Sequence, residues 1–412
     1  MLNFTSLLII GVVAVAVPLL LGLFPVVKVP AVVLEIIGGV LVGPTVLGWV
    51  HLDAPVRVVS DLGLGFLLFM AGFEIDLRRF ERQPLVLAAR AFAVSVGLAL
   101  LVGYGLQLTG QVTDGLLIAV SLMATSLGIL VPILKDARHT DSSFGHLVMA
   151  AGSLAELAPL LLVSVLFSAS SKNPATDLGL LAGFIALTAV VVVAAGWIRR
   201  WGRLRQVVER LANTSAQLRV RLVITFSLAF AVVAGHFGLA TILGTFLAGI
   251  IVRRTGRSAD AHEMLKGKLE AIGFGFLIPV FFVATGVGLN MDALFHSSRA
   301  EILVPVILVA LLLVRGVPAV LYVRTLGWPA AVAAGLLQAT SLTFIVVTTI
   351  VGIDTGHLKP STASALVVAG LLSVILYPPT AMQLLKPRAD EETAQPPGGK
   401  GALPAESGSS PV

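Results

Sequence analysis

The chain has 412 residues, of which 57% are hydrophobic and 12% are charged, and its formal net charge is +6. Soluble domains carry about 25% charged residues, so this composition excludes an ordinary soluble globular protein. The chain has no cysteine, which excludes disulfides and thiolate metal sites. The apolar residues form runs of about 20, the length that spans a bilayer as a helix, without the alternating ten-residue strands of a membrane barrel. The sequence therefore predicts an all-α polytopic protein of the lipid bilayer.

In chain order, the apolar runs predict thirteen transmembrane helices. Their expected bounds are 5–25, 31–48, 59–77, 84–108, 114–134, 144–169, 177–198, 218–235, 238–252, 269–290, 300–323, 328–353 and 361–385. The first run has no basic start, so it is interpreted as a span and not as a signal peptide. We expect residues 1–386 to form the membrane domain. Residues 387–412, rich in Pro, Gly, Ser and Glu, are expected to form a disordered cytoplasmic tail, with no fused nucleotide-binding domain.

The distribution of basic residues predicts how the chain is oriented. With the N-terminus outside, 22 of the 28 Lys and Arg residues fall in inside segments and four in outside segments, while Arg90 and Arg315 lie within spans. Basic residues favour the cytoplasmic side, so we expect the C-terminus inside the cell membrane. The positive charge is then a property of loops and does not indicate binding to nucleic acid.

The sixth predicted span carries Glu156 near its middle. A carboxylate at that depth costs about 2.5–3.5 kcal/mol on insertion scales and indicates a functional site. The alternative is a permanently protonated side chain in a helix–helix hydrogen bond. Arg315 lies at a similar depth in span eleven and is expected to be the ion-pair partner of Glu156. Glu35, near the inside end of span two, either lines an inner vestibule or reaches the lipid headgroups.

Three pairs of segments match at offsets of 206 to 215 residues and indicate an internal repeat. They are 36–43 with 242–249, the segments around Gly72 and Gly286, and 124–127 with 339–342. Chance similarity between Gly-rich and Leu-rich helices is the alternative. Each offset covers seven predicted spans, an odd number, so the two copies would face opposite ways across the membrane. Inverted repeats of this kind are typical of secondary transporters that work by alternating access.

Spans five and twelve each centre on a Thr-Ser pair and are the predicted broken helices. Thr125 and Ser126 lie in the first span, and Thr340 and Ser341 in the second. Short hydroxyl side chains can bond to the backbone groups that an unwound helix leaves free, so the two breaks are expected to meet at a polar crossing beside span six. The alternative is ordinary bonding of each hydroxyl to the carbonyl four residues earlier in an unbroken helix.

Several stretches together carry a family resemblance. They are VLEIIGGVLVGPTVLG at 33–48, LGLGFLLFMAGFEIDL at 62–77, ATSLGILVPILKDA at 124–137, ATILGTFLAGIIV at 240–252 and FLIPVFFVATGVGLNMD at 276–292. With these motifs the chain resembles the bacterial monovalent cation:proton antiporter superfamily, in the branch that includes the glutathione-gated potassium efflux antiporters. The resemblance implies a thirteen-span homodimeric antiporter, in which residues 1–386 form a core subdomain with two crossing broken helices and a dimerisation subdomain.

The resemblance also implies roles for residues. In the family an acidic residue on span six, often the second of an Asp-Asp or Asn-Asp pair, binds either cation or proton, and a basic residue on span eleven pairs with it. Those positions read Ala155-Glu156 and Arg315 here. Ala155 cannot ligate a cation, and the stretch 341–347, SLTFIVV, lacks the acidic motif of several relatives.

These observations favour exchange of a monovalent cation, Na⁺ or K⁺, for protons, with Glu156 shared between the two. Thr125, Ser126 and Ser153, which lies one turn before Glu156, would supply neutral oxygens. One carboxylate predicts electroneutral exchange without cofactor or resident metal. An enzyme is disfavoured because no catalytic pair can be named. A channel, a sodium-coupled solute symporter and a relative that has lost transport and acts in regulation remain the alternatives.

Overall fold

All regular structure in the described part of the chain is helical. The computed structural model describes residues 4–24, 29–74, 82–140, 142–166, 217–237, 241–255, 259–296 and 298–385, with isolated residues between 179 and 190. The predicted span 177–198 lies almost wholly outside these residues, and the predicted tail 387–412 lies entirely outside them. Every other predicted span overlaps a helix, and the described residues hold nine helical segments long and apolar enough to cross a membrane.

The first half of the described chain contains seven helices. They are α1 (Thr5–Leu23), α2 (Ala31–Val42), α3 (Ala54–Glu74), α4 (Arg82–Leu108), α5 (Gly115–Leu122), α6 (Leu127–Asp136) and α7 (Ser143–Leu166). The second half begins with α10 (Leu218–His236), α11 (Thr241–Thr255), α12 (Ala259–Ile272), the π-helix η1 (Gly273–Leu277), α13 (Ile278–Gly288) and α14 (Met291–Phe295). It continues with α15 (Ser298–Leu311), the π-helix η2 (Leu312–Gly316), the 3₁₀-helix η3 (Val317–Tyr322), α16 (Val323–Leu326), α17 (Trp328–Gln338), α18 (Thr343–Asp354) and α19 (Pro360–Leu384).

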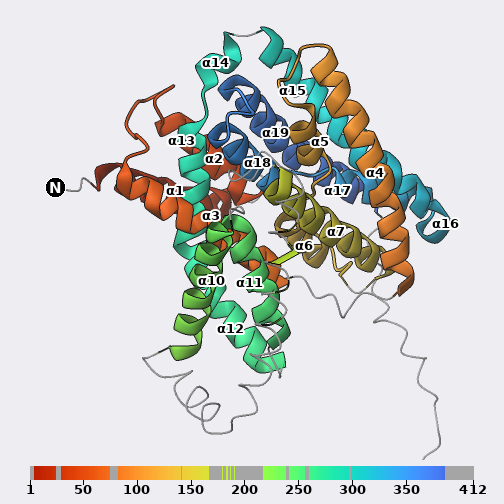
Figure 1. Cartoon of the computed structure of the whole chain (residues 1–412), viewed down its shortest axis with the longest axis horizontal. Coiled ribbons are helices and arrows are strands. Elements are labelled where there is room, and N and C mark those ends of the chain that lie inside the picture. Colours follow the sequence, from red (N-terminus) through yellow and green to blue (C-terminus); the bar gives the residue numbers. More distant parts are fainter. Residues whose placement is uncertain are drawn as a thin grey trace, which may run out of the picture.

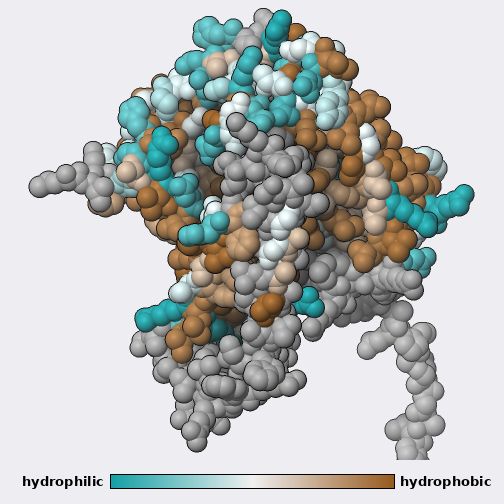
Figure 2. All heavy atoms as spheres, viewed as in Figure 1, coloured by the Kyte–Doolittle hydropathy of each residue, from teal (hydrophilic) through white to brown (hydrophobic). Residues whose placement is uncertain are grey.

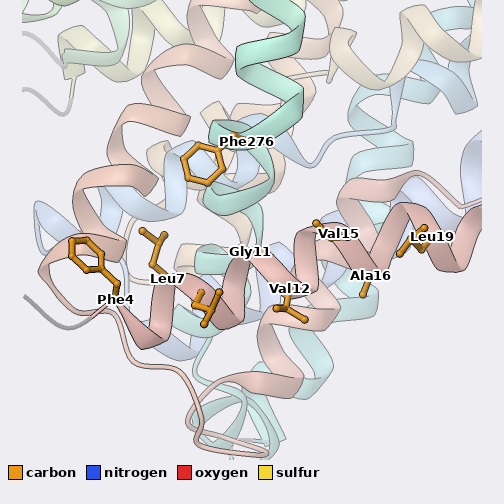
Figure 3. Close-up of a pocket in the computed structure, with 9 residues that line it drawn as sticks. Phe4, Leu7, Gly11, Val12, Val15, Ala16, Leu19 and Phe276 are labelled. Atoms are coloured by element: carbon orange, nitrogen blue, oxygen red, sulfur yellow. The ribbon is translucent and has the colours of Figure 1, made fainter.

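The surface is that of a protein surrounded by lipid. The short helix α14 lies at the upper end of the molecule and α12 at the lower end, with the longer helices between them (Figure 1). Hydrophobic residues cover much of the middle of the face in Figure 2, and hydrophilic residues gather toward the upper end. A shallow apolar groove of about 660 Å³ runs along α1 (Figure 3), and Phe276 of η1 lies on its other side.

Close-packed glycines confirm the internal repeat. A methyl group on Gly43, the residue directly after α2, would lie 3.1 Å from the Cα of Val287 in α13, and one on Gly249 of α11 would lie 2.7 Å from the amide nitrogen of Phe73 in α3. The sequence match pairs Gly43 with Gly249, and Phe73 with Val287, at offsets of 206 and 214. The pair α2–α13 is therefore repeated as the pair α11–α3. Each glycine lets two backbones approach closely, as small residues do in membrane helix packing.

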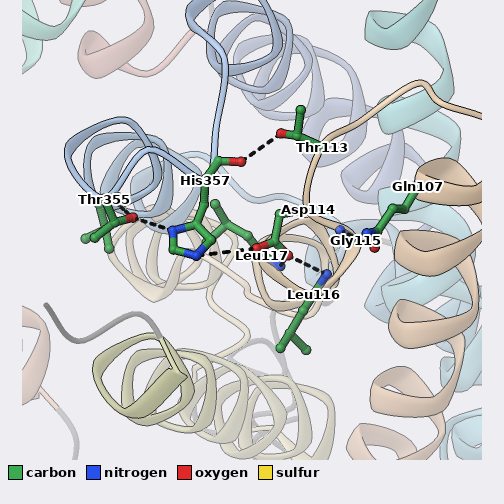
Figure 4. Close-up of polar contacts among 9 residues, drawn as sticks. Gln107, Thr113, Asp114, Gly115, Leu116, Leu117, Thr355 and His357 are labelled. Atoms are coloured by element: carbon green, nitrogen blue, oxygen red, sulfur yellow. Dashed lines mark hydrogen bonds and ion pairs between the residues drawn. The ribbon is translucent and has the colours of Figure 1, made fainter. Parts of the chain in front are cut away.

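The short helices α5 and α18 pack against each other. Their contacts run from the loops at one end of the molecule to its buried interior. Asp114 caps α5 by accepting hydrogen bonds from the amides of Leu116 (2.9 Å) and Leu117 (3.0 Å), and its other carboxylate oxygen lies 3.9 Å from Nε2 of His357, in the loop after α18 (Figure 4). Thr113 donates to the His357 carbonyl at 2.8 Å. Deeper in the molecule, the hydroxyls of Ser121 and Thr348 bond at 2.8 Å. These contacts fix where the inner ends of α5 and α18 lie.

Candidate functional site

The two predicted broken helices are broken, and they cross. Between α5 and α6 the chain is unwound at residues 123–126, and between α17 and α18 it is unwound at 339–342. The breaks touch, because the amide of Ser126 donates to the carbonyl of Thr340 at 3.1 Å. The alternative of unbroken helices is wrong, although the Thr340 hydroxyl does bond to the carbonyl of Leu336, four residues earlier, at 3.3 Å.

Ser126 caps a helix that belongs to the other repeat. Its buried hydroxyl accepts hydrogen bonds from the amides of Leu342 (2.9 Å) and Thr343 (3.0 Å), the first groups of α18. This is the role of an N-cap side chain, which satisfies amides that have no partner within their own helix. The repeat partner of Ser126 is Ser341, whose buried hydroxyl has no hydrogen-bond partner among the described residues. The crossing is therefore not symmetric in its bonding.

Thr125 connects the crossing to two further elements. Its amide donates to the carbonyl of Ala155 in α7 at 3.3 Å, and its hydroxyl donates to the carbonyl of Gln338 at 2.6 Å. The same hydroxyl oxygen accepts a hydrogen bond from Nε of Arg315 at 2.9 Å. Thr125 thus links α7, the end of α17 and η2 in one buried place.

Glu156 lies on the face of α7 that meets the first break. The bond between Thr125 and Ala155 places the backbone beside Glu156 against the unwound segment. Gly152, one turn earlier on the same face, packs against Leu127, the first residue of α6, whose side chain would lie 2.7 Å from a methyl group there. The Glu156 side chain is 4% exposed, and its Oε2 has no hydrogen-bond partner in the described part of the chain. No described residue donates to this oxygen, so it can accept a hydrogen bond without losing one.

Arg315 does not contact Glu156, contrary to the predicted ion pair. Within the described residues, no salt bridge joins the two side chains. The guanidinium instead donates to three neutral oxygens, those of Thr125 at 2.9 Å, Ser95 at 3.1 Å and the Gln338 side chain at 3.3 Å. A guanidinium has five donors in fixed directions, and two hydroxyls and one amide oxygen accept from it here without a carboxylate. The side chain is 1% exposed.

Sequence reasoning missed the residues that hold Arg315. These are Ser95 and Phe92 of α4, whose ring centroid lies 5.6 Å from the guanidinium carbon, and Gln338 at the end of α17. Gln338 is a polar residue directly before the predicted break, a signal that the sequence did offer. Ser95 and Phe92 carry no such signal, because their contact with Arg315 spans more than 200 residues of chain.

The remaining predicted site residues lie apart from these bonds. Ser153 is buried on α7, three residues before Glu156, and so shares its face of the helix. Glu35 is buried on α2, which packs along α13. No hydrogen bond or ion pair between Glu35 and the crossing is found in the described residues, so its vestibule role stays a prediction.

The family model described as sodium/hydrogen exchanger, transmembrane, matches residues 11–386. The chain belongs to this family. Sodium/hydrogen exchangers are multi-pass membrane transporters and not enzymes, so the predicted class is confirmed.

Among curated relatives of this exchanger family, the chain is 28% identical to the putative Na(+)/H(+) antiporter YjbQ of Bacillus subtilis, over 92% of this chain and 63% of that protein. It thus spans less than two thirds of the length of that relative. It is 27% identical to a Na(+)/H(+) antiporter of Enterococcus hirae, over 85% and 90% of the two chains, and 28% identical to the Na(+)/H(+)-K(+) antiporter GerN of Bacillus cereus, over 85% and 88%.

The fold of the exchanger matches a solved structure. The sodium proton antiporter MjNhaP1 of Methanocaldococcus jannaschii superimposes with a TM-score of 0.66, covering 92% of this chain and 97% of that one. The sequence identity is 16%, so this similarity concerns the fold. It confirms the predicted all-helical membrane fold.

Proposed function

We propose that the protein exchanges a monovalent cation, Na⁺ or K⁺, for protons across the cell membrane by alternating access. The observation that carries the proposal is Glu156, a buried carboxylate with an unpaired oxygen, beside the crossing of two broken helices. The names of several relatives describe antiporters for these ions.

Glu156 is the shared site in this mechanism. A carboxylate is neutralised equally by one proton or by one bound monovalent cation, so each ligand excludes the other. Neutral oxygens suit a hard cation as further ligands, and Thr125, Ser126 and Ser153 are the candidates on the faces that meet there. The Thr125 and Ser126 hydroxyls already bond to protein groups, so they would serve through rearrangement or through their backbone carbonyls.

One shared carboxylate makes the proposed exchange electroneutral. Arg315 keeps its charge in every step because a guanidinium stays protonated in proteins, and its hydrogen bonds go to neutral oxygens and not to Glu156. The N-terminus is proposed to lie outside and the C-terminus inside, and the protein is proposed to be a homodimer, as the family resemblance implies. The mass of the purified protein in detergent, corrected for bound detergent, tests the dimer.

The test of the exchange uses proteoliposomes with a pH dye inside. Salt added to acid-loaded vesicles should drive protons out, at a rate unchanged by a potassium and valinomycin clamp of the voltage. Na⁺, K⁺ and Li⁺ are added in turn to identify the ion. Glu156→Gln keeps the side-chain shape and should abolish exchange, whereas Glu263→Gln, an exposed change on α12, should leave it intact. Persistent exchange in Glu156→Gln would refute the shared site, and a requirement for a second solute would indicate a sodium-coupled symporter instead.

A further inference from the structure

A histidine joins the loop after α18 to the start of α5 (Figure 4). Nε2 of His357 lies 3.9 Å from Oδ2 of Asp114, and the His357 carbonyl accepts a hydrogen bond from the Thr113 hydroxyl at 2.8 Å. The two side chains of the pair are 44% and 21% exposed, so water can reach both. The proposed exchange at Glu156 gives this pair no role.

The local chain fixes where the His357 ring lies. Gly356 turns the chain back at the end of α18 with a φ of 75°, a conformation that glycine adopts at little cost. The amide of Leu358 then bonds to the carbonyl of Gly352 at 2.9 Å. A methyl group on Gly352 would lie 2.5 Å from the side chain of Leu117 in α5 and 2.9 Å from Cβ of Leu358. Close packing therefore holds this loop against α5.

Hydrogen bonding decides which nitrogen of the His357 ring is basic. The Thr355 hydroxyl donates to the carbonyl of Val351 at 2.7 Å, and the same hydroxyl oxygen lies 3.0 Å from Nδ1 of His357. A hydroxyl has one proton, so its oxygen accepts from Nδ1–H. In the neutral ring Nε2 then carries a lone pair, and this is the nitrogen nearest to Oδ2 of Asp114.

Asp114 divides its two oxygens between two tasks. Oδ1 caps α5 by accepting from the amides of Leu116 and Leu117, and Oδ2 is the oxygen near His357. A neutral ring presents a lone pair to this carboxylate, which is unfavourable. A proton on Nε2 turns the same contact into an ion pair without disturbing the cap.

Other charged residues lie near His357 in the chain or act on those that do. Asp354 ends α18, three residues before His357, and Lys359 directly precedes α19, two residues after it. Asp61 of α3 is close enough to Asp354 for their charges to repel. Asp114 is the carboxylate that the structure places against the ring, so both partners of this pair are varied in the experiment.

We propose that His357 is a proton-binding site that regulates exchange from the end of the molecule where α5 begins and α18 ends. A proton on Nε2 binds the two helices together through Asp114. The inner ends of α5 and α18 lead into the crossing, so a tighter contact between them restricts the rearrangement of Thr125 and Ser126 and slows exchange. This effect on rate rests on the proposed exchange at Glu156.

The proposal predicts how the maximal rate depends on pH. Acidifying this face from about pH 7.5 to about pH 5.5, a range that includes the titration of an imidazole, should lower the maximal rate about two- to fivefold, the factor that a half-exposed ion pair supplies. His357→Gln cannot form the pair, and Asp114→Asn keeps a capping oxygen without the charge, so both variants should lose this decrease. His296→Gln is the matched control, an exposed histidine at the end of α14, and should retain it.

The experiment measures initial uptake of labelled Na⁺ or K⁺ by the full-length protein in oriented proteoliposomes, with the pH of each face set separately. Competition between protons and cations at Glu156 changes the half-saturating cation concentration, whereas the His357 site changes the rate at saturating cation. Hydrogen exchange of the amides in 113–118 and 352–358 is a second measurement that needs no transport. At about pH 5.5 it should be about two- to fivefold slower in the wild type than in His357→Gln, and equal in the two at about pH 7.5.

The outcomes separate the two proposals. A decrease in maximal rate that is lost in His357→Gln and Asp114→Asn but kept in His296→Gln supports regulation by His357. An undiminished decrease in His357→Gln, or equal hydrogen exchange in wild type and His357→Gln at about pH 5.5, would overturn it and leave exchange at Glu156 intact. A wild-type protein that takes up no cation but shows the difference in hydrogen exchange would overturn the proposed exchange, and with it the effect on rate, while supporting the proton site.

Discussion

The Ser126 hydroxyl caps α18, a helix of the other repeat, and we call this contact the trans cap. It gives a prediction with an internal control. Replacing Ser126 with Ala removes the hydroxyl that accepts from the amides of Leu342 and Thr343. Replacing Ser341 with Ala removes the matching hydroxyl of the other repeat, which has no partner among the described residues. The two changes are chemically identical, equally buried and 215 residues apart in repeats that match. They differ only in the hydrogen bonds that are lost.

The size of the effect follows from the two amides. A buried donor left without a partner costs about 1–3 kcal/mol, and loss of an N-cap serine typically costs about 1 kcal/mol. Ser126→Ala should therefore lower the free energy of unfolding by about 3 kcal/mol, and Ser341→Ala by less than about 0.5 kcal/mol. With about 2.1 cal/mol/K of unfolding entropy per residue, 3 kcal/mol corresponds to a Tm decrease of roughly 3–4 °C for a chain of 412 residues.

The assay is thermal unfolding of the purified variants in one detergent, followed by intrinsic fluorescence. Ser126→Thr keeps a hydroxyl and should recover part of the loss, which separates the hydrogen bonds from packing. Equal Tm decreases for Ser126→Ala and Ser341→Ala would refute the trans cap, because the cost would then come from burial and not from the two amides.

Three further predictions concern other contacts. Gly72→Ala places a methyl group 2.1 Å from a carbonyl oxygen of α11 and should prevent folding, whereas Gly97→Ala, with open space around it, should leave yield and Tm in detergent unchanged. Asp114→Ala removes the cap of α5 and should cost about 0.5–2 kcal/mol, measured as a Tm decrease against Asp114→Asn, which keeps a capping oxygen. Arg315→Lys keeps the charge, but an ammonium group cannot reach the three acceptors of the planar guanidinium, so the free energy of unfolding should fall by about 1.5–3 kcal/mol per lost bond, measured as a Tm decrease. Glu156→Gln should not lower the Tm, because Arg315 does not bond to Glu156. A large Tm decrease in Glu156→Gln would instead indicate an ion pair between the two residues.

The spans and the breaks could be predicted because their causes are local. A run of about 20 apolar residues satisfies every backbone group as a helix, and a Thr-Ser pair within such a run supplies short polar groups for an interruption. The repeat was visible because small residues must recur where helices pack closely, as Gly43 and Gly249 do. Each signal lies within a few residues of the feature that it predicts.

The partner of Arg315 could not be predicted because depth in the membrane does not specify direction. Arg315 and Glu156 were expected to pair as charges at a similar depth. The π-helix η2, however, presents the guanidinium to Thr125 and Gln338, and α4 adds Ser95. Neutral hydrogen-bond acceptors such as Ser, Thr and Gln side chains occur throughout these spans. Counting charged residues therefore does not identify the ones that bind Arg315.

The bonding of Arg315 bears directly on how the proposed exchange is coupled. Held by neutral oxygens, the guanidinium contributes one fixed positive charge whether Glu156 carries a proton or a cation, so the two loaded forms have the same total charge. The empty form differs, because it leaves an ionised carboxylate buried with an unpaired oxygen. An unpaired buried charge costs several kcal/mol, which disfavours movement of the empty core. An arginine paired to Glu156 would remove that cost and let the empty core move. The separation of these two charges therefore favours exchange over leak.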